Sequence, residues 1–114
     1  MTDCLFCRIV AGEVPSKGVV STERTYAFAD IEPGAPVHVL VVPREHVESA
    51  DHVGPQHASL LAEMLATAQA VARAEGVAAS GYRLVLNVGE DARNSVPHLH
   101  MHLLGGRSMG WPPG

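Results

Sequence analysis

Three histidines alternate with apolar residues near the end of the chain, at His98, His100 and His102. Alternate residues of a strand share one face. We therefore expect the three imidazoles to point the same way, while the residues between them point into the core: Leu99, Met101 and Leu103. A lone histidine in an apolar strand is usually a satisfied core residue, but packing alone does not require three in strict alternation. The run indicates a chemical role.

Two chemistries use such a row of imidazoles. Three histidines can hold a catalytic zinc with an open fourth position, or one histidine can act as a nucleophile supported by the others. The loop before the row favours phosphorus chemistry, because Asn94, Ser95 and Asn87 offer neutral donors that suit a bound phosphate. Spacing alone leaves the three-histidine zinc site open.

A second motif, Cys4-x-x-Cys7, lies at the N-terminus. In a reducing compartment such a pair indicates a metal site or a redox pair more than a structural disulfide. A thioredoxin-like redox pair would open a helix within a βαβ unit, and we predict no such unit in this leader. Two structural thiols are the remaining alternative.

Composition narrows the possible partners. The hydrophobic fraction is 46% and the aromatic fraction 4%, so the core must be largely aliphatic. The net charge is -4 and Lys and Arg form no cluster, which argues against polymeric DNA or RNA as a partner. The N-terminus lacks the pattern of a secretory signal, and the longest apolar stretch, residues 37–43, is too short to span a bilayer. We expect a cytoplasmic protein that has no membrane partner.

The elements that would position these motifs form an α+β pattern. One amphipathic helix is predicted over residues 56–75, with Gly76 at its C-terminal cap. The strands are predicted over residues 19–22, 25–30, 37–42, 82–88 and 98–104. Residues 37–42 are apolar on both faces except at His38, as in a central strand that Pro43 ends. We expect one domain over residues 1–114, with a leader (1–16) and a Gly/Pro-rich tail (105–114) that carries Trp111.

On these residues the sequence resembles the histidine triad (HIT) family, and within it the nucleoside phosphoramidase branch of histidine triad nucleotide-binding proteins. The Cys-x-x-Cys is typical of its bacterial members. The most specific parts are residues 95–107 and the Trp-Pro-Pro-Gly ending at 111–114. The resemblance implies a five-stranded antiparallel sheet with one long helix and a short one. It also implies a two-fold homodimer with a continuous ten-stranded sheet, in which the Trp111 tail lies near the partner's cleft.

The resemblance implies a reaction in which His100 attacks the α-phosphorus of a purine nucleoside phosphoramidate or aminoacyl-adenylate-like substrate. Water then hydrolyses the nucleotidyl-histidine, and no catalytic metal is required. The implied catalytic set is His38, Ser95, His100 and His102. The implied nucleotide-binding set is Phe6, Ile9, Phe28, Asp30, Ile31, Leu40, Asn87, Asn94, Ser95, Val96, His100 and His102. The alternatives are a dinucleoside polyphosphate hydrolase of the same family and a nucleotide-binding regulatory or interaction module.

By the same resemblance, Cys4, Cys7, His46 and His98 would hold a structural zinc. That zinc would fix His98, whose carbonyl could then orient His100. Two residues of the phosphate loop depart from the branch, which usually has Gly where Arg93 stands and Gln where Asn94 stands. His52 and His57 match no family role, and we expect both at the surface.

Overall fold

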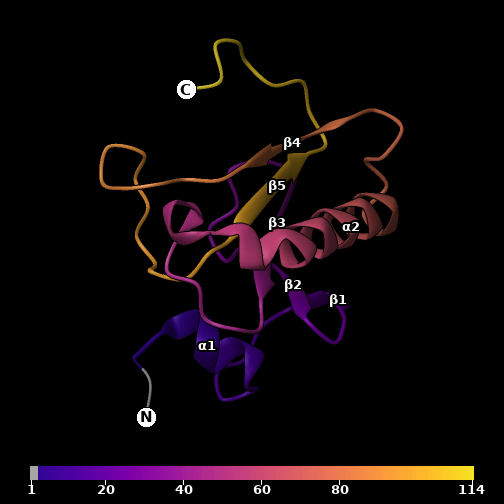
Figure 1. Ribbon diagram of the computed structural model, residues 1–114. Helices are drawn as coiled ribbons and strands as arrows, with labels where there is room; N and C mark the ends of the chain where they lie inside the picture. Colours follow the sequence, from indigo (N-terminus) through magenta and orange to yellow (C-terminus); the bar gives the residue numbers. More distant parts are fainter. Residues whose placement is uncertain (1–2) are drawn as a thin grey trace.

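The computed structural model describes residues 3–114. In this part of the chain five strands form one antiparallel sheet in the order β1-β2-β3-β5-β4 (Figure 1). The strands are β1 (Gly18–Ser21), β2 (Thr25–Ala29), β3 (Val37–Pro43), β4 (Tyr82–Val85) and β5 (Met101–Gly105). The predicted α+β architecture, with a five-stranded antiparallel sheet and one long helix, is confirmed.

The central strand β3 is buried on both faces, as its apolar run predicts. Val39 and Val41 contribute to a core beneath the long helix. Leu40 and Val42 belong to a second core on the opposite face. Side chains of a strand alternate between its two faces, so one strand supplies both cores.

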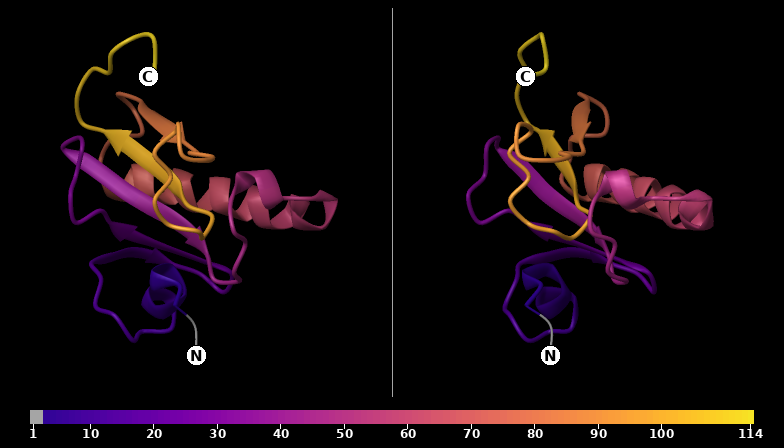
Figure 2. Two further views of the ribbon diagram at one scale, coloured as in Figure 1. Left: turned by 90° about the vertical axis from the view of Figure 1, so that its left-hand side faces the viewer. Right: turned by 60° about the vertical axis from the view of Figure 1, so that its left-hand side comes forward.

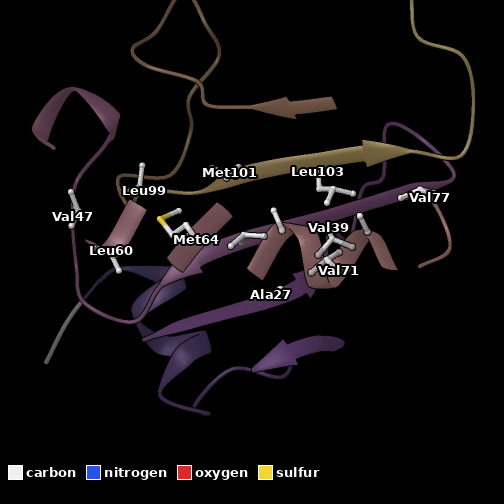
Figure 3. Close-up of a cluster of buried hydrophobic side chains, with 13 residues drawn as sticks. Ala27, Val39, Val47, Leu60, Met64, Val71, Val77, Leu99, Met101 and Leu103 are labelled. Atoms are coloured by element: carbon white, nitrogen blue, oxygen red, sulfur yellow. The ribbon is translucent and has the colours of Figure 1, made fainter. Parts of the chain in front are cut away.

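The long helix α2 (Ala58–Ala74) covers one face of the sheet. Its buried stripe includes Leu60, Met64 and Val71, which meet Val39 and Leu103 of the sheet (Figure 3). Short 3-10 turns at Ala50–His52 (η1) and Pro55–His57 (η2) precede it, so the helix begins two residues later than predicted. The chain reverses after it at Gly76, where φ is +74°, a value that favours glycine. None of the helices within residues 3–114 has the length and apolar composition to cross a membrane.

A short helix, α1 (Leu5–Val10), lies on the other face of the sheet (Figure 2). Its buried residue Phe6 meets Phe28 edge-to-face, with the ring centroids 5.5 Å apart. Cys4 caps this helix, because its Sγ accepts a hydrogen bond from the Cys7 backbone N–H at 3.3 Å. The cysteine pair therefore opens a short helix, and the fold that the resemblance implies includes one.

Strands β4 and β5 depart most from their predicted bounds. β3 ends at Pro43, and its last pair with β5 is Val41 with Met101. The β3–β5 ladder stops at this pair although β3 runs on to Pro43, and Leu99 N–H instead donates to the Val47 carbonyl at 2.6 Å. The β4–β5 ladder ends at the pair of Val85 with His102, and β4 ends at Val85. Leu86 and Val88 are exposed as a result.

Candidate functional site

Strand register brings an apolar wall and a histidine together on the α1 face of the sheet. Phe28 pairs with Leu40 across β2 and β3, and Leu40 pairs with His102 across β3 and β5. Directly paired residues of neighbouring strands project from the same face. The sheet therefore supports Phe28, Leu40 and His102 as one row.

A cleft of about 390 Å³ opens between this row, α1 and the loop before β5. Ten of the twelve predicted nucleotide-binding residues line it: Phe6, Ile9, Phe28, Asp30, Ile31, Leu40, Ser95, Val96, His100 and His102. Leu5, Ala29 and Glu32 also line it; sequence reasoning missed these three, although each is adjacent in sequence to a predicted residue. Ile31 is 94% exposed, so its apolar side chain is available to cover a ligand.

The two predicted residues outside that lining lie close to it. The Asn87 amide nitrogen is 3.5 Å from His102 Nε2. Asn94 faces a second hollow of about 320 Å³, which shares Ser95 and Val96 with the cleft. Among the described side chains, Asn94 Oδ1 is the buried polar atom that has no hydrogen-bond partner.

The environment of His100 fixes its tautomer. Its Nδ1 lies 2.7 Å from the His98 carbonyl oxygen, and a carbonyl can only accept a hydrogen bond. The Nδ1 atom must therefore carry the proton, which leaves a lone pair on Nε2. The ring is buried to 9% exposure, packs edge-to-face on Phe6 with centroids 5.1 Å apart, and lines the cleft. A neutral imidazole held in this way can act as a nucleophile.

His102 lies between the cleft and two further groups of the α1 face. Its Nδ1 is 2.9 Å from His38 Nε2, and the same His38 atom is 3.4 Å from Asp30 Oδ2. Burial, followed by the charges of His100 and His38, lowers the pKa of His102 to about 4, although Asp30 opposes the shift. His102 is therefore neutral at pH 7. His38 is absent from the cleft lining and meets the site through His102.

The predicted metal ligands also come together. His98 Nδ1 lies 3.2 Å from Cys4 Sγ and 3.4 Å from Cys7 Sγ, and His46 Nδ1 lies 3.4 Å from Cys7 Sγ. Bond lengths of about 2.3 Å to sulfur and 2.0–2.1 Å to nitrogen place S and N roughly 3.5 Å apart around tetrahedral zinc. The four ligand atoms all lie within 4.8 Å of one another. The cluster therefore fits a metal ion, and we call it the thiol–imidazole cluster.

The protonation of His98 also suits a metal ligand. Its Nε2 lies 2.9 Å from the Pro43 carbonyl oxygen, so Nε2 carries the proton and the lone pair on Nδ1 faces the thiols. Desolvation of the fully buried ring is the main cause that lowers the pKa of His98. Sequence reasoning missed Pro43 here, because a backbone carbonyl leaves no side-chain signal.

The geometry bears on two alternatives, a zinc site made by the three triad histidines and a redox pair made by the two cysteines. The described residues contain two sets close enough to share an ion, the thiol–imidazole cluster and Asp30 with His38 and His102, and neither set holds all three triad histidines. The three-histidine zinc site is therefore wrong. The redox-pair alternative gains a helix at the cysteines but lacks its βαβ unit, because α1 leads into an antiparallel hairpin.

Three remaining residues singled out in the sequence lie at the periphery. Arg93 is exposed and has a φ of +64°, a backbone conformation that glycine adopts without steric cost. His52 is exposed and contacts Ser49 and Glu48. His57 is half-buried and accepts a hydrogen bond from the Gly54 N–H.

The tail after β5 extends beyond the β4–β5 side of the sheet (Figure 1). Arg83 of β4 donates a hydrogen bond to the Gly110 carbonyl at 3.0 Å. The next residue, Trp111, is 82% exposed. The only tryptophan of the chain is therefore presented to solvent.

Comparisons with known proteins agree with this geometry. Residues 11–109 match the family model of the HIT domain. A HIT family hydrolase from Legionella pneumophila superimposes with a TM-score of 0.96 and is 46% identical, over 98% of this chain and 100% of that one. Adenylylsulfatase HINT1 of Arabidopsis thaliana is 41% identical over 96% of this chain and 76% of its own. A 14 kDa zinc-binding protein of Brassica juncea is 40% identical over 98% of this chain and 100% of its own. The chain therefore belongs to the HIT family and, within it, to the HINT-like branch.

Proposed function

We propose that this protein is a nucleotide-binding hydrolase that cleaves purine nucleoside phosphoramidates or aminoacyl-adenylate-like substrates through a nucleotidyl intermediate on His100. The observation that carries the proposal is the 2.7 Å contact between His100 Nδ1 and the His98 carbonyl. That contact leaves the Nε2 lone pair available in a cleft with an apolar wall and neutral donors. The name of the Arabidopsis relative, an adenylylsulfatase, supports attack on an adenylyl group.

The first step forms a bond between His100 Nε2 and the α-phosphorus and breaks the bond from phosphorus to the leaving nitrogen. The leaving amine departs with that electron pair and takes a proton from water. The phosphorylated ring keeps its Nδ1 proton and becomes cationic, and the His98 carbonyl stabilises that charge. In the second step water attacks phosphorus, releases a proton and returns the electron pair to Nε2. One difficult displacement thus becomes two easier ones.

Binding of the nucleotide is assigned to the rest of the cleft. The purine would lie against the apolar residues Phe6, Phe28 and Leu40, and Asp30 would take the ribose hydroxyls. The Ser95 hydroxyl, the backbone N–H of Val96 and the Asn87 amide would meet the phosphate. Removal of one such donor, as in Ser95→Ala, is expected to lower kcat/KM by ~10²-fold.

We also propose that Cys4, Cys7, His46 and His98 hold zinc. Four protein ligands close a tetrahedral site, so the metal would supply structure and not a reactive position. It would tie α1 to the segment before β5 and hold the His98 carbonyl against His100. The zinc-binding relative of Brassica juncea supports this assignment.

A two-fold dimer is proposed through the outer edge of β4. β4 is an edge strand, and apolar side chains of Leu86 and Val88 continue beyond it in an exposed position. The other edge, β1, carries an irregularity between Gly18 and Val20, a feature that discourages edge-to-edge pairing. Pairing of two β4 strands would give a continuous ten-stranded sheet and would bring each exposed Trp111 towards the partner's cleft.

Kinetics and binding together test the function. Wild type, His100→Asn and His100→Ala are each measured for hydrolysis of an adenosine 5′-phosphoramidate and, by calorimetry, for AMP binding. We expect kcat/KM to fall by at least ~10³-fold in both variants while AMP still binds. Equal hydrolysis by wild type and variants would refute the nucleophile. AMP binding without hydrolysis in the wild type would leave the nucleotide-binding interaction module instead.

A further inference from the structure

The set formed by Asp30, His38 and His102 resembles a metal site in its spacing but differs in its protons. His38 Nδ1 lies 2.9 Å from the Gly34 backbone N–H. That N–H can only donate, so Nδ1 holds a lone pair and the ring proton is on Nε2. A metal ion would need that same Nε2 lone pair. The Gly34 peptide thus turns the set into a chain of hydrogen bonds.

The chain continues from His38 to His102. The His38 Nε2–H donates to His102 Nδ1 at 2.9 Å, and Asp30 Oδ2 at 3.4 Å lies on the same side. A neutral imidazole has one N–H and one lone pair. Since His102 Nδ1 accepts, its own proton must be on Nε2. The lowered pKa of His102 is consistent with this neutral form.

The His102 Nε2–H also decides how Asn87 is oriented. The Asn87 amide nitrogen lies 3.5 Å from this atom, and two N–H donors cannot pair with each other. The two ends of a side-chain amide have nearly the same shape, and their assignment depends on the hydrogen bonds around them. A donor on His102 requires the Asn87 oxygen to face it. The Asn87 NH₂ group is then directed away from His102.

The carbonyl of Gly34 is held by Arg107, which follows β5. Arg107 Nη2 donates to the Gly34 carbonyl at 3.0 Å, across 73 positions of sequence. Gly34 and Arg107 are both exposed, and neither lines the cleft. The N–H and the C=O of Gly34, which belong to its two flanking peptide groups, link Arg107 on the outside to His38 on the inside.

We propose that Arg107 and the Gly34 peptide are positioning elements which, through His38, hold His102 in the tautomer that presents Nε2–H to the phosphate of a bound nucleotide. One part of this inference, the contact between His102 and a phosphate, rests on the proposed function. In this role His102 is a hydrogen-bond donor and keeps its proton. Complete transfer of that proton would leave His102 or His38 anionic, because the Gly34 N–H cannot replace the proton that His38 would give up.

The direct test is nitrogen-15 NMR of the histidine rings in the whole protein at pH 7, without nucleotide. The shifts of a ring nitrogen distinguish a protonated from an unprotonated atom. We expect protonated Nε2 and unprotonated Nδ1 in both His38 and His102. Protonated Nδ1 in either ring would overturn the proposal, even in a protein that hydrolyses phosphoramidates. Loss of hydrolysis with these tautomers intact would instead count against the proposed function.

Variants of Arg107 test the outer hydrogen bond. Arg107→Gln cannot bridge the same distance, whereas Arg107→Lys keeps a long side chain with a donor. We expect Arg107→Gln to lower kcat by about 10-fold with little change in KM, and Arg107→Lys to recover most of it. The His102 ring shifts should change in Arg107→Gln alone. Unchanged kcat and unchanged His102 shifts in Arg107→Gln would exclude a role for Arg107.

Variants of Gly34 test the inner hydrogen bond. An added Cβ at Gly34 would find His38 Nδ1 at 3.7 Å, an ordinary contact, so Gly34→Ala keeps the N–H and is the matched control. Gly34→Pro removes the N–H. We expect Gly34→Pro alone to shift the His38 tautomer and to lower kcat, by ~10- to 10²-fold. Equal tautomers and equal kcat in the two variants would refute the role of this peptide. If Gly34→Pro fails to fold, the comparison of Arg107→Gln with Arg107→Lys and the tautomers of the wild-type protein still test the proposal.

Discussion

Two clusters on the same face of the sheet have similar spacing and opposite chemistry. In the thiol–imidazole cluster, the Pro43 carbonyl accepts a hydrogen bond from the His98 Nε2–H, so the Nδ1 lone pair faces Cys4 and Cys7. In the set of Asp30, His38 and His102, the Gly34 N–H donates a hydrogen bond to His38 Nδ1. The His38 proton is therefore on Nε2, between the two imidazoles. A backbone acceptor at His98 thus leaves a lone pair available for a metal ion, whereas a backbone donor at His38 leaves an N–H that makes a hydrogen bond to the next imidazole.

The difference shows that spacing alone does not define a metal site. Both sets satisfy the same distance criterion, and both contain two histidines. What distinguishes them is the group on the far nitrogen of a ring, which sets the tautomer. His100 lies between the two clusters, with its tautomer set by the His98 carbonyl.

The largest expected effect comes from breaking the thiol–imidazole cluster. Cys4→Ser removes a thiolate ligand and should abolish stoichiometric zinc binding. Because metal binding to such a site is coupled to folding, the free energy of unfolding should fall by at least about 3 kcal/mol. The measurement is metal content by mass spectrometry of untagged protein purified without chelator, together with denaturant unfolding.

Asp30→Asn is the matched control for that experiment. It removes the carboxylate of the second set and should leave one zinc per chain. Two zinc ions per wild-type chain, with one lost in Asp30→Asn, would contradict the claim that this set is a hydrogen-bonded chain and not a metal site. A metal-free wild type that is fully folded would contradict the zinc proposal.

A smaller effect follows from the neutral state of His102. Its pKa is about 4 in the folded protein, against about 6.5 in the unfolded chain. As the pH falls from 6.5 towards 4, the unfolded chain takes up a proton that the folded protein does not. Stability is therefore full above pH 6.5, declines through this window and levels off below pH 4. The contribution is at most about 3 kcal/mol, measured by denaturant unfolding at a series of pH values.

His102→Gln isolates this contribution, because it removes the titrating ring and leaves His38, His100 and Asp30 around it. The difference in unfolding free energy between wild type and His102→Gln should narrow as the pH falls from 6.5 to 4. A difference that is constant over that range would show that His102 titrates normally in the folded protein.

The resemblance to the HIT family named most of the residues that line the cleft and all four members of the thiol–imidazole cluster, and the structure brings these residues together. The sequence was insufficient wherever a backbone group decides the outcome, as at Pro43 and Gly34. The Arg107 contact joins residues 73 positions apart, which local patterns do not report. The strand predicted over residues 98–104 failed at its start, because the ladder with β3 stops at Met101 and the Leu99 N–H pairs with the Val47 carbonyl instead.

The smallest expected effect concerns the loop between β4 and β5. Arg93 adopts a φ of +64°, which costs a non-glycine residue roughly 1 kcal/mol. Arg93→Gly should therefore raise the unfolding free energy by up to about 1 kcal/mol and leave kcat with a neutral leaving group unchanged. Thermal unfolding and steady-state kinetics measure both quantities. A large loss of kcat would assign Arg93 a part in binding the leaving group.

The central claim is that His100 forms a bond to phosphorus through Nε2. Rapid quenching of wild-type protein with an adenosine 5′-phosphoramidate, followed by peptide mass spectrometry, tests it most directly. The expected result is an adenylyl adduct on His100 that forms and decays at rates consistent with turnover. Complete turnover with no adduct on His100, or an adduct on His102 instead, would contradict the assignment.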